Sequence, residues 1–78
     1  MDILKAKDYF NLGVIKAATV HAPCVMHPKG WAIYFDAKLV DSTLVFKTMR
    51  GEVRQFKTLD AAAKVLAEIG FKRWSVEL

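Results

Sequence analysis

The sequence is poor in the residues that cross-link a chain or build nucleotide-binding loops. Cys24 is its only cysteine, so no disulfide can form within the chain. Gly13, Gly30, Gly51 and Gly70 stand alone, whereas phosphate-cradling loops need clustered glycines. These absences argue against a disulfide-stapled secreted scaffold and against a Walker-type or dinucleotide-binding enzyme.

Long apolar runs are also missing. Asp2, Lys5, Lys7 and Asp8 interrupt the first residues, which therefore lack the apolar core of a signal peptide. No stretch approaches the ~20 apolar residues that span a bilayer. Together with the single cysteine, this pattern leads us to expect a cytoplasmic protein without a membrane partner.

The chain does contain enough apolar residues to form a core. Its 78 residues are 54% hydrophobic and 26% charged, which is too apolar for a disordered chain. We expect one domain over residues 1–78, near the lower size at which a chain folds without disulfides or metal. The net charge of +4 suits nucleic acid, an anionic membrane surface or an acidic protein, because all three use the same long-range attraction.

Apolar periodicity and turn residues predict the elements of the fold. These are a helix within 2–12, strands over 14–20, 31–36, 43–49 and 53–57, a helix over 59–69 and a strand over 74–78, with a loop over 21–30 and a polar turn near Asp41 and Ser42. The order α-β-β-β-β-α-β predicts an α+β domain, in which an antiparallel sheet of about four to five strands carries one or two helices.

Capping residues predict where the helices begin and end. Asp2 and Asp8 are alternative N-caps of the first helix, and Gly13 can adopt the positive φ that ends it. Thr58 is a favourable N-cap of the second helix, and Gly70 follows its last turn.

The third and fourth predicted strands form a hairpin whose register the sequence leaves open. If the turn holds the three residues 50–52, Phe46 lies opposite Phe56 and both face the core. A register shifted by one residue pairs Lys47 with Arg54 instead.

Positive charge is concentrated on this hairpin, which makes it the first candidate site. Its cations are Lys47, Arg50, Arg54 and Lys57, against the single acid Glu52. Lys72 and Arg73, on the connection into the last strand, are expected to extend the same patch. A β-ribbon of this kind fits the major groove of DNA and contacts phosphates or guanine edges through arginine. The competing interpretation is that these charges only protect an edge hairpin from aggregation.

A second candidate surface is apolar. Tyr34, Val45, Met49 and Val53 are predicted to lie on the sheet face away from the second helix, where a solvated sheet would carry polar residues. This excess indicates a surface for self-association or for a larger protein partner. The alternative is that the first helix and the first strand cover that face.

Two further residue sets have both a functional and a structural interpretation, and the structural one is favoured for each. His21, Cys24 and His27 offer zinc ligands at three-residue spacing, but a closed site needs a fourth ligand, and no oxyanion-hole motif supports a cysteine nucleophile. Trp31 and Trp74 could stack on unpaired bases, yet both alternate in phase with core residues. We therefore expect neither a metal nor a cofactor.

The structural residues resemble those of one family. The segments that carry the resemblance are Leu12-Gly13-Val14-Ile15, Gly30-Trp31, Arg50-Gly51, Phe56-Lys57-Thr58-Leu59-Asp60-Ala61-Ala62 and Ile69-Gly70. In these segments the chain resembles small ParC-like, partition-associated accessory proteins of plasmids and integrative elements. The resemblance implies a bacterial mobile-element context beside DNA maintenance machinery, and it transfers no functional site.

These patterns lead to one functional expectation and one alternative. We expect a non-enzymatic DNA-binding accessory protein, with a homodimer as its expected assembly, that takes no small-molecule substrate. The alternative is a protein-interaction or inhibitor module that docks through the apolar sheet face. Salt separates the two, because binding to phosphates weakens steeply with salt and an apolar interface responds little.

Overall fold

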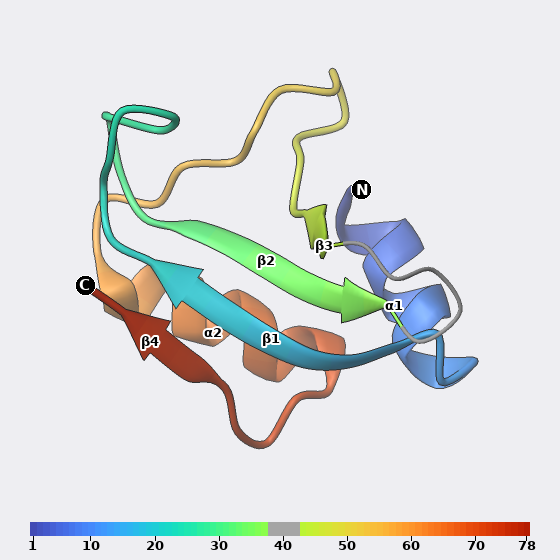
Figure 1. Cartoon of the computed structure of the whole chain (residues 1–78). Helices are drawn as coiled ribbons and strands as arrows, with labels where there is room; N and C mark the ends of the chain where they lie inside the picture. The colour runs from blue at the N-terminus through green and yellow to red at the C-terminus, as the bar shows by residue number, and fades with distance from the viewer. Residues whose placement is uncertain (38–42) are drawn as a thin grey trace.

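A computed structural model describes residues 1–37 and 43–78. Its elements, in chain order, are helix α1 (Ile3–Asn11), strands β1 (Ile15–His21), β2 (Ala32–Ala37) and β3 (Thr43–Val45), helix α2 (Leu59–Ile69) and strand β4 (Ser75–Glu77) (Figure 1). The α+β class is confirmed, and the described order is α-β-β-β-α-β. The predicted turn near Asp41 and Ser42 lies outside the described residues.

The sheet is mixed, so the prediction of a purely antiparallel sheet is wrong. Its strand order is β3-β2-β1-β4, with β2 antiparallel to both β1 and β3 and with β4 parallel to β1. The reason lies in the connection: α2 carries the chain back past β2 and β1 to the far edge of the sheet. A helical crossover of this kind returns the chain in the direction of the strand it left, which makes the next strand parallel.

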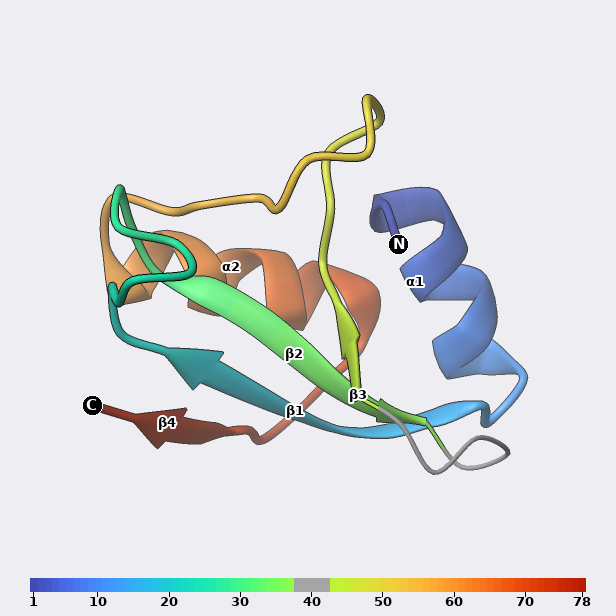
Figure 2. The ribbon, with the colours of Figure 1, turned by 45° about the horizontal axis from the view of Figure 1, so that its top comes forward.

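Both helices lie on the same side of the sheet (Figure 2). Within residues 1–37 and 43–78, no helix lies on the other face, which is called the uncovered face below. The buried side chains of β1 and β2 that face the helices include Ala18, Val20, Ile33 and Phe35. Residues Ala62, Leu66 and Ile69 recur on one face of α2 and are buried in the same core. The core therefore forms between the helices and one face of the sheet, as an amphipathic helix requires.

The predicted strand over 53–57 is not a regular strand. Val53 forms an isolated antiparallel bridge to Lys47, and Phe56 forms one to Trp31. The segment thus crosses from the end of β3 to the start of β2, and no single partner strand runs beside it for long enough to form a ladder. Its path depends on Gly30, since a Cβ there would lie 2.3 Å from the Phe56 carbonyl oxygen.

Neither predicted hairpin register is correct. Because Lys47 pairs with Val53, the turn holds the residues 48–52 and is longer than expected. The prediction that Phe46 and Phe56 both face the core still holds, because a shift of two residues leaves each side chain on the same face of its strand. Phe46 and Phe56 are both buried and their rings stack with centroids 6.1 Å apart.

The predicted helix ends are confirmed, and the choice between the two N-caps is settled. The Asp2 carboxylate accepts a hydrogen bond from the Lys5 N–H at 3.0 Å, whereas Asp8 lies inside α1. Gly13 follows α1 with φ of 75°. The Thr58 hydroxyl accepts from the Ala61 N–H at 3.1 Å, and Gly70 ends α2 with φ of 129°.

Within residues 1–37 and 43–78, no helix is of a length and apolarity that would cross a membrane.

Candidate functional site

The turn over residues 48–52 projects from the body of the molecule (Figure 1). Hydrogen bonds of Thr48 hold its shape. The Thr48 N–H donates to the Glu52 carbonyl at 2.7 Å, and the Gly51 N–H donates to the Thr48 carbonyl at 2.9 Å. The Thr48 hydroxyl oxygen accepts from the N–H groups of Arg50 and Glu52, both at 3.3 Å. These bonds satisfy the backbone locally, so the turn is ordered although little of the core touches it.

Four cations are distributed along this turn, the residue before it and the segment after it. Arg50 is exposed at the tip of the turn, and Lys57 is exposed just before α2. The Arg54 guanidinium lies over the Phe56 ring, 5.0 Å from its centroid, which restricts its rotamers before any ligand arrives. Lys47 is half-buried, and its N–H donates to the Met1 carbonyl at 2.6 Å.

Lys29 is a fifth cation beside this segment that the sequence reasoning missed. Its N–H donates to the Gln55 side-chain oxygen at 2.8 Å, which ties the 21–30 loop to the 53–57 segment. The two residues are 26 positions apart, and no local pattern indicates their contact. We call residues 47–57 together with Lys29 the basic arm.

The described part of the chain offers the basic arm no ion-pair partner. Its only carboxylate, that of Glu52, is exposed, and the one ion pair found within residues 1–37 and 43–78 joins His21 to Glu77. The cations of the basic arm therefore keep their charge available for an external anion.

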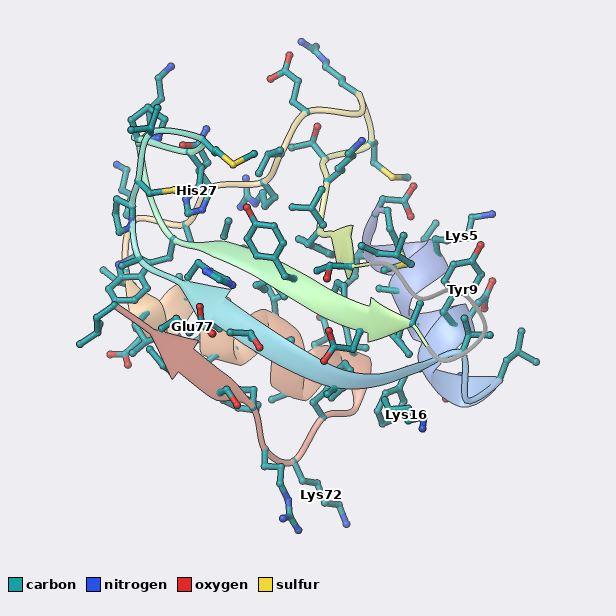
Figure 3. The ribbon with its side chains drawn as sticks, in the orientation of Figure 1. Lys5, Tyr9, Lys16, His27, Lys72 and Glu77 are labelled. Atoms are coloured by element: carbon teal, nitrogen blue, oxygen red, sulfur yellow. The ribbon has the colours of Figure 1, made fainter. Side chains whose placement is uncertain are left out.

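Lys72 and Arg73 do not extend the basic arm, so that prediction is wrong. In Figure 3, Lys72 lies at the bottom of the molecule, opposite the projecting turn. The reason is α2, whose 11 residues carry the chain about 16 Å away from Lys57 at 1.5 Å per residue. Lys72 and Arg73 instead meet Lys16 around a pocket of about 440 Å³.

The four residues of the predicted apolar surface do not lie together on the sheet. Tyr34 and Val45 are direct partners across β2 and β3 and are half-buried, and Val53 is half-buried opposite Lys47. Met49 lies in the projecting turn with 70% of its surface exposed and is not part of the sheet.

The rest of the uncovered sheet face is polar or small. The register places Thr19 and Ser75 in the row of Tyr34, and it places His21 beside Glu77. Because α1 packs with α2 on the other side of the sheet (Figure 2), the alternative in which the first helix covers this face is wrong.

His21, Cys24 and His27 do not come together as a ligand set. Cys24 and His27 are in contact, with 3.4 Å between Sγ and Nε2, whereas His21 lies against Tyr34 and faces Glu77, with 3.4 Å between Nδ1 and the carboxylate. Within residues 1–37 and 43–78, no three potential ligands gather around one point.

His27 has a structural role that its neighbours explain. The side chain is buried, and Nδ1 donates to the Gly30 carbonyl at 2.9 Å, because a carbonyl oxygen can only accept. Nε2 is then the acceptor that faces the Cys24 thiol. The pair closes the 21–30 loop and positions Gly30 next to the basic arm.

Tyr34 has a perturbed phenol. Burial raises its pKa above the ordinary value of 10.0, and the electrostatic effect of the nearby Cys24 side chain raises it further. The His21 ring packs edge-on against the Tyr34 ring at 4.5 Å between centroids. The hydroxyl therefore keeps its proton at neutral pH and can donate a hydrogen bond.

The two tryptophans pack against the core, as predicted. Trp31 and Trp74 are both half-buried beside the buried cluster. Trp31 also exchanges two backbone hydrogen bonds of 2.8 Å with Phe56, so the base of the basic arm is anchored to the first residue before β2.

Comparison with known proteins agrees with the resemblance seen in the sequence. No curated protein and no solved structure matches the chain. A family model described as ParC-like matches residues 2–78, which covers both helices, the sheet and the basic arm. The segments that carried the resemblance all lie within this match, and the chain belongs to the ParC-like family.

Proposed function

We propose that this chain is a non-enzymatic accessory protein of a bacterial mobile element and that it binds DNA through the basic arm. The observation that carries the proposal is the ordered, projecting turn with exposed Arg50 at its tip and Arg54 held over Phe56. Family membership supports a small accessory role, and the DNA contact rests on the charge and shape of the arm.

Physical chemistry favours a polyanion as the ligand of such an arm. Each phosphate that a lysine or arginine neutralises releases condensed counterions, which drives binding and makes it sensitive to salt. Arginine also reaches guanine edges in the major groove, about 12 Å wide, which admits a two-stranded ribbon. The exposed arm presents its arginines on a projecting turn and not on a regular ribbon, and they are free to contact phosphates or base edges. The sheet face without a helix carries Asp36 and Glu77, which repel phosphates.

The test replaces the two arginines of the arm. We expect Arg50→Gln with Arg54→Gln to weaken binding to a DNA duplex at least tenfold at low salt. The slope of log affinity against log salt should fall by about 1.8, because about 0.9 is lost for each phosphate contact. Fluorescence anisotropy of a labelled duplex at several salt concentrations measures both quantities.

A charge-matched variant controls for net charge. Lys5→Gln with Lys64→Gln removes the same two charges from exposed positions on α1 and α2, and we expect it to bind the duplex within twofold of the wild type. If the arginine variant and the lysine variant lose affinity equally, binding follows net charge alone and the assignment of the arm is wrong.

The alternative function is a protein-interaction or inhibitor module, including self-association as a homodimer, that uses the uncovered sheet face. It is supported by the half-buried pair of Tyr34 and Val45 on a face without a helix (Figure 2). An apolar interface of this kind should persist at high salt. Sedimentation of the wild type and of a Val45→Glu variant tests it, and a wild type that sediments as a monomer at every concentration would contradict self-association.

A further inference from the structure

A groove opens along the edge of β1 where β4 does not pair with it. β4 pairs only with Thr19–His21, and the chain before β4, which carries Lys72, bows away from the first half of β1 (Figure 3). Two adjoining pockets of about 440 Å³ and 210 Å³ occupy this opening, and both are lined by Lys16 and Arg73. The volume of the larger pocket, about 440 Å³, is in the range of small-ligand sites.

Three cations from distant parts of the sequence line this groove. Lys16 stands at a register shift in β1, between Ile15 and Ala17, and a bulge of this kind turns a side chain out of the regular alternation. Lys72 and Arg73 arrive from the end of α2. All three are exposed, and within residues 1–37 and 43–78 they have no carboxylate partner.

The helix ends near the groove reduce this charge without cancelling it. α1 ends before Gly13 and α2 ends at Gly70, and each C-terminus carries about half a negative charge. Three full positive charges therefore exceed the opposing dipoles by roughly two units. An anion is the ligand that this balance favours.

The floor of the groove is aromatic. Phe10 and Phe71 line the larger pocket, and Trp74 lines the smaller one. Phe10 and Trp74 are half-buried, whereas Phe71 is buried and supports Phe10 from the core. The Phe10 and Phe71 rings pack edge to face at 4.7 Å between centroids. Phe10 also lies against Gly70, where a Cβ would come within 2.6 Å of the ring. Flat rings of a ligand can pack against these aromatic side chains while its negative charges contact the cations. The groove therefore favours a ligand in which rings and negative charges alternate.

We propose that this groove binds a short stretch of single-stranded nucleic acid. Its phosphates meet Lys16, Lys72 and Arg73. Its bases lie against the exposed parts of Phe10 and Trp74, as in proteins that combine a basic track with stacking side chains. Two other anions fit the groove less well. An acidic peptide carries the negative charges but lacks the flat rings, and inorganic phosphate is too small to fill either pocket. The inference deepens the proposed function and rests on it for the class of ligand, but it uses none of the residues of the basic arm.

The experiment follows backbone amide shifts of labelled wild-type protein during titration with hexathymidylate. We expect shifts at residues 16–18 and 70–75 that shrink at higher salt. Lys16→Gln with Arg73→Gln should weaken this binding at least tenfold and lower the salt slope by about 1.4, at about 0.7 for each phosphate of a single strand. Lys72→Gln with Arg73→Gln is a second variant with the same expectation, and both variants change only exposed side chains.

Variants of the two sites separate this inference from the proposed function. Arg50→Gln with Arg54→Gln should leave hexathymidylate binding within twofold of the wild type while it weakens duplex binding. If hexathymidylate shifts only residues 47–57, or if the groove variants bind it as tightly as the wild type, the groove is not the site. An oligoglutamate peptide that binds the groove as tightly as hexathymidylate would overturn the assignment to nucleic acid. A failure of duplex binding at the arm alone leaves the groove result unaffected.

Discussion

At the scale of single residues, Gly30 is the glycine at which an added Cβ would meet the closest contact. The Phe56 carbonyl oxygen occupies the space that a Cβ at Gly30 would need, at 2.3 Å, and backbone atoms cannot turn aside as a long side chain can. We expect Gly30→Ala to lower the free energy of unfolding by about 2 to 3 kcal/mol, the upper part of the range for overpacked sites. Urea unfolding followed by tryptophan fluorescence measures the change.

Gly13 is the control for this prediction. A Cβ there meets nothing within 4 Å, and only the positive φ of 75° is unfavourable for alanine. Gly13→Ala should therefore cost about 1 kcal/mol, the penalty of the left-handed conformation alone. A smaller loss in Gly30→Ala than in Gly13→Ala would show that the contact with Phe56 is not a constraint.

Tyr34 should make stability depend on pH in the alkaline range. Its pKa is raised in the folded protein by burial and by the electrostatic effect of Cys24, so the unfolded chain loses the phenolic proton first. The stabilisation from the neutral phenol is complete below the unfolded pKa of about 10. It is lost as the pH rises through the folded pKa, because the folded state then binds more protons than the unfolded one.

Comparison with Tyr34→Phe isolates this contribution from the lysines that titrate in the same range. The difference in unfolding free energy between wild type and Tyr34→Phe should stay constant from pH 7 to about 9 and then shift against the wild type. Cys24→Ser removes the second cause, so the shift should become smaller. A difference that is flat up to pH 11 would mean that the phenol is not perturbed.

At the scale of elements, α2 depends on its first residue. The Thr58 hydroxyl caps the Ala61 N–H at 3.1 Å, and Thr58 also separates the basic arm from the helix. Thr58→Ala should lower the free energy of unfolding by about 1 kcal/mol, and Thr58→Ser should restore most of it. Thermal unfolding by circular dichroism distinguishes the three proteins, and equal losses in both variants would contradict a capping role.

The sequence predicts the elements whose causes are local and fails where the cause is a distant contact. Asp2, Thr58 and Gly70 act on backbone groups within four residues, so the helix ends could be located from the sequence. The pairing of Phe56 with Trp31 joins distant segments. Residues 53–57 resemble a hairpin strand in the sequence because they directly follow the turn residues 50–52, but Val53 pairs with Lys47 whereas Phe56 pairs with Trp31.

The candidate sites, too, could be predicted only where they depend on residues close in the sequence. Arg50 and Arg54 could be recognised from the sequence because they flank one turn. The assignment of Lys72 and Arg73 to the same patch failed, since their location depends on the length and direction of α2. Lys29 and Lys16 were missed because each joins its cluster only through the tertiary fold.

At the scale of the whole molecule, the described chain is as compact as its length allows. Its radius of gyration is 11.4 Å, close to the about 11.5 Å expected for a folded domain of this size. The irregular segment between β3 and α2 is held to the body by the buried Phe46 and Phe56, and its turn over residues 48–52 projects from it (Figure 1). Eight of the 12 lysines and arginines belong to two separate sets, five in the basic arm and three at the groove beside β1.

The short pairing of β4 with β1 favours local unfolding of this strand. β4 is held by three residue pairs with β1, and its side chains are all exposed, so little apolar contact opposes its release. Segments of this kind open locally at a fraction of the global unfolding cost. Each opening of β4 would widen the groove and uncover the edge of β1, so ligand entry there is coupled to the least stable strand of the sheet.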